Sequence, residues 1–218
     1  MSQIIIDPIR KPRTTSGTVS ITPIPNKARQ FGFVPDLRHC KAGDLILSCS
    51  VKPGFLEKHI YRIQTRAGFS AEDSRWTHAA VFLYEDFIVE AVPLRGVISR
   101  TLYSDIPESV LRVRRSPGLH DNERYKIALC AQRMLGTRYN IKAALSLGWR
   151  AFLSGMWDRA WFPSINSVII CSKVFYDAHV EITRKLLSGC PISDLVMPAH
   201  LSATSDLQDI NVPWVKLS

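Results

Sequence analysis

The sequence lacks several features that would assign it to a class of proteins at once. No stretch reaches the ~18 uncharged apolar residues that a membrane-spanning helix needs, because charged side chains interrupt the most apolar segment, residues 141–163. The opening MSQIIIDPIRKPR has no long apolar region of the kind that signal peptides carry. We therefore expect a protein made in the cytoplasm without a classical leader, which would reach another compartment, such as the periplasm of a target cell, by secretion machinery.

Cysteine is sparse, and its spacing follows no known framework. Five cysteines, at positions 40, 49, 130, 171 and 190, form no CxxC pair. An odd number without close spacing argues against a disulfide framework and against a structural zinc site. We expect no metal, no other cofactor and a reducing compartment during synthesis.

Acidic residues are too few to balance the basic ones, which leaves a formal net charge of +9. This excess favours acidic partners such as cell-wall polymer or a membrane surface. No zinc finger, helix-turn-helix or aromatic RNA-binding pattern accompanies the charge, so a nucleic-acid partner is not expected. Part of the charge lies in residues 1–35, a proline-containing arm that we expect to be extended, either as a solubilising tail or as a binding arm.

Strand patterns dominate the first half of the remaining chain, residues 36–218. Strands are predicted at residues 42–50, 77–84, 87–92, from 96 onward and at 109–116, with a tight turn at Glu85-Asp86. Between the first two, residues 59–69 read as a short helix and residues 70–76 as a polar loop.

Helical spacing dominates the second half of the chain. Helices are predicted at residues 121–136, within 140–157 and from about 171 to 188. Asp121 is the expected N-cap of the first of these helices, and Leu129 is among the residues expected to face inward. The sequence thus predicts one α+β domain, with an antiparallel strand-rich first half and helices packed against it.

Cys171 lies where the β-like run SVII changes to the helical pattern CSKVFYDAHVEITRKLLSG. Unpaired amides and the helix dipole favour a thiolate at a helix N-terminus. A nucleophilic cysteine also needs a base and a third group that orients the base. The apolar face of the same helix supports the alternative, in which Cys171 is an inert buried side chain.

His78 and Glu90 are the candidate partners of Cys171. His179 lies eight positions along the same helix, ~12 Å away, so it cannot be the base. Glu90 interrupts the apolar run FIVEAV, and a buried carboxylate needs a partner, either His78 or an arginine such as Arg95. A strict two-residue hairpin turn puts His78 and Glu90 on opposite faces, whereas an odd loop or a bulge puts them on one face.

Six segments resemble a known family in their order along the chain: GDLILS, THAAVFL, VEAVPLRGV, LGTRYN, ICSKVFYDA and SDLVMPAHLSAT. Over roughly residues 36–205 they are similar to the permuted papain-like amidases of the YiiX/YaeF type, the circularly permuted branch of the NlpC-type cysteine peptidases. The resemblance implies a permuted papain-like fold in which histidine and the acidic group precede the cysteine. It implies Cys171 as nucleophile, His78 as base, Glu90 as orienting group and Tyr139 as a residue that stabilises the oxyanion.

The resemblance also implies an activity, cleavage of an amide bond through an acyl-enzyme. Peptidoglycan stem peptides are the first expected substrate, since positive charge suits the anionic wall and leaderless basic hydrolases resemble secreted antibacterial effectors. Secretion machinery and an immunity protein are then expected partners. Two alternatives stay open: a lipid acyltransferase or thioesterase of the same fold, favoured by the tryptophan-rich residues 141–163, and a non-catalytic binding module.

Overall fold

The computed structural model describes residues 5–9, 15–20, 23–138, 170–191 and 196–218. Its main sheet has six strands in the order β6-β5-β4-β3-β7-β8, and all neighbours are antiparallel. The strands are β3 (Leu45–Ser50), β4 (His78–Tyr84), β5 (Phe87–Val92), β6 (Gly96–Thr101), β7 (Ser109–Arg115) and β8 (Gln208–Ile210). The α+β class is confirmed, and the strand-rich first half lies where the alternation of apolar residues predicted it.

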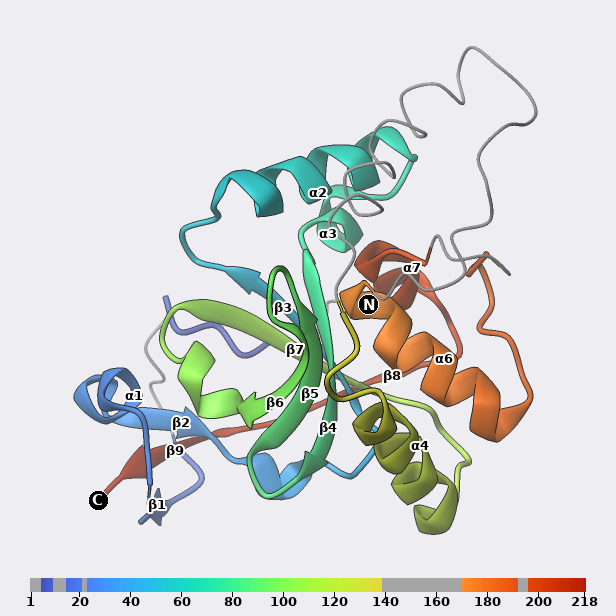
Figure 1. Ribbon diagram of the computed structural model, residues 1–218. Coiled ribbons are helices and arrows are strands. Elements are labelled where there is room, and N and C mark those ends of the chain that lie inside the picture. The colour runs from blue at the N-terminus through green and yellow to red at the C-terminus, as the bar shows by residue number, and fades with distance from the viewer. Residues whose placement is uncertain (1–4, 10–14, 21–22, 139–169, 192–195) are drawn as a thin grey trace.

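Helices α4 (Asp121–Arg133) and α6 (Cys171–Thr183) pack on one face of this sheet, and a smaller sheet together with α1 (Asn26–Phe31) packs on the other (Figure 1). The other helices are α2 (Phe55–Arg66), α3 (Ala71–Ser74) and α7 (Pro198–Ala203). Because side chains alternate along a strand, Ala79 and Val81 of β4 pack with α4 and α6, whereas Ala80 and Phe82 pack on the opposite side. No helix in the described ranges is long and apolar enough to cross a membrane.

The N-terminal arm takes part in the fold, which corrects the expectation of an extended segment. Its strands β1 (Thr18–Val19) and β2 (Phe33–Pro35) both pair with β9 (Trp214–Leu217) near the other end of the chain. Ile24, Ala28 and Val34 are buried in the core between the main sheet and the smaller sheet. The division of the chain at residue 35 stays a prediction.

Several predicted boundaries in the first half and in α4 were wrong. The helix expected at residues 59–69 begins at Phe55, and the expected loop at 70–76 contains α3, whose N-cap Ser70 accepts a hydrogen bond from the Asp73 amide. The N-cap of α4 is His120 rather than Asp121. Leu129 is 40% exposed rather than buried, since α4 turns a neighbouring stripe toward the core.

The last predicted helix has the expected start and an earlier end. Helix α6 begins at Cys171, as the change of pattern indicates, but it ends at Thr183 instead of Ser188. Its C-cap, Arg184, adopts a left-handed conformation with φ 56°, which stops the helix before the glycine that was expected to end it. The helix predicted within residues 140–157 lies outside the described residues.

Candidate active site

A bulge in the β4–β5 hairpin decides which face of the sheet Glu90 occupies. Tyr84 pairs with Phe87, so the turn itself has two residues, but Phe82 pairs with Ile88 because Leu83 is an extra residue on β4. From there inward the register shifts by one, and Ala80 lies opposite Glu90. His78, two residues before Ala80, therefore shares a face with Glu90. Of the two registers that the sequence allowed, the structure has the bulged one.

The carboxylate of Glu90 is buried and holds two cationic partners. Glu90 is 2% exposed, and its Oε2 lies 2.7 Å from Nε2 of His78. Arg100, two residues from the β6 position opposite Glu90, donates through Nη2 to the same oxygen at 3.0 Å and through Nε to Oε1. Asp105 completes the cluster, with Oδ1 2.9 Å from Nη2 of Arg100. The arginine partner is thus Arg100 and not Arg95.

This cluster keeps Glu90 ionised despite its burial. Burial by itself raises the pKa of a carboxyl group. The charges of His78 and Arg100 and their hydrogen bonds outweigh burial and lower the pKa of Glu90 to about 2. Glu90 is therefore a fixed negative charge at neutral pH, and it favours the protonated form of the imidazole beside it.

Cys171 is the first residue of α6, and three groups support its sulfur. The imidazole of His78 forms a hydrogen bond with the thiol, and the backbone amides of Ala79 and Ser172 donate to it. Burial opposes ionisation, since Cys171 is 6% exposed. The charge of His78 and these hydrogen bonds outweigh burial and hold the pKa of Cys171 below its ordinary value.

The pKa of His78 moves in the opposite direction from that of Cys171. Burial opposes the imidazolium, but the charges of Glu90 and Cys171 and the hydrogen bonds to both raise the pKa of His78 well above its ordinary value. Nε2 is engaged by Glu90, which leaves Nδ1 as the nitrogen available to the thiol. The His78 side chain is 25% exposed, so the pair reaches solvent along the imidazole. A thiolate–imidazolium pair is the state that this geometry favours.

The other four cysteines have the opposite electrostatics. All five cysteines are free thiols. Burial raises the pKa of Cys40 and Cys49, raises that of Cys130 to about 11, and raises that of Cys190 to about 12. Cys171 is the one cysteine whose surroundings favour the thiolate.

Gln64 fixes the segment that leads into His78. Its side chain is fully buried on α2. Its amide nitrogen donates to the carbonyls of Ser74 and Trp76 at 2.8 and 2.9 Å, and its amide oxygen accepts from the backbone of Ala199 at 2.8 Å. One side chain thus joins α2, residues 74–76 just before β4, and α7.

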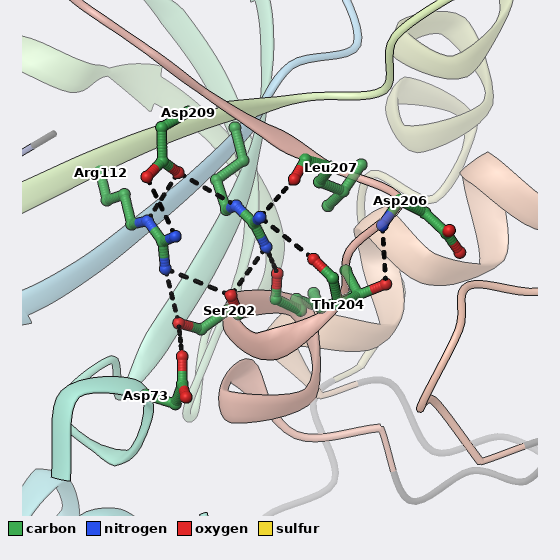
Figure 2. A network of polar contacts seen from close by, with 9 residues as sticks. Asp73, Arg112, Ser202, Thr204, Asp206, Leu207 and Asp209 are labelled. Atoms are coloured by element: carbon green, nitrogen blue, oxygen red, sulfur yellow. Dashed lines mark hydrogen bonds and ion pairs between the residues drawn. The ribbon is translucent and has the colours of Figure 1, made fainter. Parts of the chain in front are cut away.

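A second polar network anchors α7 to the sheet (Figure 2). Arg112 of β7 donates to Asp209 at 2.8 Å and to the hydroxyl of Ser202 at 2.7 Å, and that hydroxyl donates to Asp73 of α3 at 2.6 Å. Beside it, Arg114 donates to the backbone carbonyls of Leu201, Ser202, Thr204 and Leu207. Buried arginines thus satisfy the carbonyls that α7 leaves free at its C-terminal end. The segment before His78 is thus held by Gln64 of α2 and, at Asp73, by the network that runs through Ser202 to Arg112 of the sheet.

The structure brings three of the four predicted site residues together. Cys171, His78 and Glu90 form one chain of contacts, while Tyr139 lies outside the described residues. His179, which helix spacing had set aside, is buried elsewhere, with Nε2 3.3 Å from the Ser116 hydroxyl. The sequence did not identify Arg100 as a member of the site. Arg100 lies two residues after Ile98, which pairs with Glu90, so its side chain is on the same face of the sheet as that of Glu90.

Comparison with known proteins shows a likeness of fold. No family model matches the sequence, and no curated protein matches it. The structure is similar to the crystal structure of the metalloprotein yiiX from Escherichia coli O157:H7, DUF1105, with a TM-score of 0.51. The two are 18% identical, and the match covers 78% of this chain and 96% of that chain. The chain therefore has a YiiX-like α+β fold.

The protein of similar fold is a metalloprotein, so a set of metal donors is a relevant feature of the described residues. Within the described ranges no group of three or more His, Cys, Asp or Glu side chains is placed to hold a metal ion. At the candidate site the carboxylate of Glu90 is already taken by His78 and Arg100. These residues do not fit a metal.

Proposed function

We propose that the chain is a cysteine hydrolase that cleaves amide bonds through an acyl-enzyme. The observation that carries the proposal is the chain of contacts from buried Glu90 through His78 to Cys171 at the start of a helix. The YiiX-like fold and the order of these residues, which matches that of the permuted papain-like amidases, add support. Opposite pKa shifts of a cysteine and a histidine in contact are typical of an activated nucleophile and its base.

The first half-reaction forms a thioester. The Cys171 sulfur attacks the carbonyl carbon, and a carbon–sulfur bond forms while the carbonyl oxygen becomes an oxyanion. The backbone amide of Cys171, the first of its helix and without an intrahelical acceptor, is placed to donate to that oxygen. The imidazolium of His78 gives its proton to the leaving nitrogen, and the carbon–nitrogen bond breaks.

The second half-reaction returns the enzyme to its starting state. Neutral His78 takes a proton from water as the water oxygen attacks the thioester carbon. The carbon–sulfur bond breaks, the acid product leaves, and the thiolate–imidazolium pair is restored. Glu90 stabilises the imidazolium in both halves and fixes which ring nitrogen faces the sulfur.

Peptidoglycan stem peptides are the proposed substrate, because a net charge of +9 favours an anionic polymer. In this proposal the protein acts as a secreted antibacterial effector, with delivery machinery and an immunity protein as partners. Expression with and without an export signal tests the compartment. Toxicity that requires export and disappears in Cys171→Ala supports the proposal, whereas toxicity without export contradicts it.

Purified substrates test the reaction itself. Wild type, Cys171→Ala and the control Cys190→Ala are incubated separately with wall sacculi and with phospholipid vesicles. Released muropeptides from the wild type and the control, but not from Cys171→Ala, are the expected result. Freed fatty acid would instead indicate the lipid-directed alternative, and no product from either substrate would favour a binding module.

A further inference from the structure

A cationic hollow lies between α2 and the ends of β3 and β4, and one of its lining residues, Thr77, directly precedes His78. Its volume is about 490 Å³, and its lining includes Lys58 and Arg62 of α2, Arg75, which follows α3, and Thr77. A hollow of this size holds a small ligand or one group of a larger one. We call it the α2 pocket.

The described residues do not neutralise the cations of the α2 pocket. No ion pair of Lys58, Arg62 or Arg75 occurs in the described part of the chain. Lys58 and Arg62 are four residues apart on one helix, a spacing at which like charges repel. The one carboxylate in the lining, Glu57, accepts hydrogen bonds from Ser50 and from the Gly54 amide. The lining thus keeps an excess of positive charge.

Arg75 is fixed by two contacts that leave most of its N–H donors available. Its guanidinium lies 5.1 Å from the centre of the Trp76 ring and forms a hydrogen bond with the Cys49 sulfur. A guanidinium has five N–H donors, and a thiol is a weak acceptor. Arg75 is therefore positioned to bind oxygen atoms of an anion.

Thr77 supplies an independent indication of a ligand. Its side chain is 5% exposed, and its Oγ1 is the one buried side-chain polar atom without a hydrogen-bond partner among the described residues. Burying an unpaired hydroxyl is unfavourable, so such a group needs an explanation. Thr77 lines the α2 pocket, and rotation of its side chain toward an acceptor oxygen bound there would satisfy the hydroxyl.

We propose that the α2 pocket binds an oxyanion group, a carboxylate or a phosphate, of the substrate that Cys171 attacks. Thr77 lines the pocket, and the next residue, His78, contacts the thiol. The α2 pocket and the nucleophile's base therefore both lie at the start of β4, on consecutive residues of the chain. The inference rests on the proposed function for the role of Cys171, and it adds that the substrate is anionic near the bond that is cleaved.

Protection of Cys171 from alkylation tests the inference without knowledge of the substrate. The rate of Cys171 alkylation by iodoacetamide is measured at constant ionic strength with N-acetylglycine, with its neutral amide N-acetylglycinamide, and with inorganic phosphate. We expect saturable protection by N-acetylglycine and none by the amide. Stronger protection by phosphate would identify phosphate rather than carboxylate as the preferred oxyanion.

Variants of the lining identify the site of protection. Arg75→Gln is expected to raise the concentration for half-protection about tenfold, and Arg66→Gln, at the exposed end of α2, is expected to leave it unchanged. Thr77→Val is expected to weaken protection and to raise the Tm, because it removes an unpaired hydroxyl. A structural role for the hydroxyl would lower the Tm instead.

The outcomes separate this inference from the proposed function. Fast alkylation of Cys171 that no anion slows, or that both probes slow equally, overturns the α2 pocket as an oxyanion site and leaves the proposed function standing. Alkylation of Cys171 no faster than that of Cys130 contradicts the proposed function itself. Protection that Arg75→Gln and Thr77→Val leave unchanged overturns the assignment to this pocket.

Discussion

Selective alkylation of Cys171 is the sharpest test of the thiolate–imidazolium pair, because exposure and electrostatics predict opposite orders of reaction. Cys171 is 6% exposed, whereas Cys49 and Cys190 are only partly buried. Accessibility alone would therefore have Cys49 and Cys190 react before Cys171. The pKa of Cys171 is lowered, and those of the other two are raised, so ionisation predicts that Cys171 reacts first.

The size of the effect follows from the ionised fractions. At pH 7 a thiol with a pKa of about 11, as at Cys130, is ionised about 100-fold less than one at the ordinary value of 9.0. The logarithm of thiolate reactivity rises with the pKa with a slope of about 0.45, so the thiolate with the pKa of about 11 is about eightfold more reactive and offsets part of this difference. Cys171, with a pKa below 9.0, should therefore react more than about tenfold faster than Cys130. For Cys190, with a pKa of about 12, the same reasoning gives more than about 40-fold.

Peptide mapping by mass spectrometry after limited treatment with iodoacetamide measures these rates at all five cysteines. In urea the five rates should become similar, since the surroundings of each thiol are then lost. Faster labelling of Cys49 or Cys190 than of Cys171 in the native protein would refute the electrostatic reasoning.

Three further predictions concern the residues around the pair. Glu90→Gln should slow Cys171 alkylation at mildly acidic pH about tenfold or more, because the imidazolium loses its counter-charge. The carboxyl pKa of about 2 lies below its ordinary value of 4.5, so the stability it contributes is present above pH 4.5 and is lost as the pH falls toward 2. In urea unfolding the wild type should lose about 3 kcal/mol more than Glu90→Gln over that range. Gln64→Leu should lower the free energy of unfolding by about 3 kcal/mol, about 1 kcal/mol for each of three lost hydrogen bonds, and should slow Cys171 alkylation as well. Thr77→Val should raise the free energy of unfolding by about 1 kcal/mol, as measured by urea unfolding.

Matched variants control for these changes. Glu72→Gln and Gln132→Leu alter exposed side chains of the same types, and both should stay within about 0.5 kcal/mol of the wild type. An alkylation rate that Glu90→Gln leaves unchanged would contradict the role given to that carboxylate. Equal losses for Gln64→Leu and Gln132→Leu would contradict the account of how His78 is positioned.

Local patterns in the sequence were enough to predict most strands and the start of α6. Strand β5 has the predicted bounds, Phe87–Val92, because its apolar run is closed by turn residues on both sides. The end of α6 was missed since Arg184, a residue without left-handed preference, takes that conformation. The place of the arm was missed because β2 is formed by pairing with β9, which lies about 180 residues further along the chain.

The candidate site was predictable in its members but not in its geometry. The order of His78, Glu90 and Cys171 and their flanking segments named the three residues. No turn residue marks Leu83 as the extra residue of a bulge. The sequence therefore left two hairpin registers open, and only one of them puts His78 and Glu90 on the same face. Arg100 carries no local sign of its partner, since its contact with Glu90 depends on the β5–β6 register.

The bulge at Leu83 makes the length of the hairpin part of the chemistry. The number of residues between His78 and Glu90 can change only by an even number if both side chains are to stay on one face of the sheet. Gain or loss of one residue in this stretch would turn the carboxylate toward the aliphatic side chains under α4 and α6, while gain or loss of two would restore its direction. Natural variation in this loop should therefore come in steps of two residues wherever the chemistry is retained.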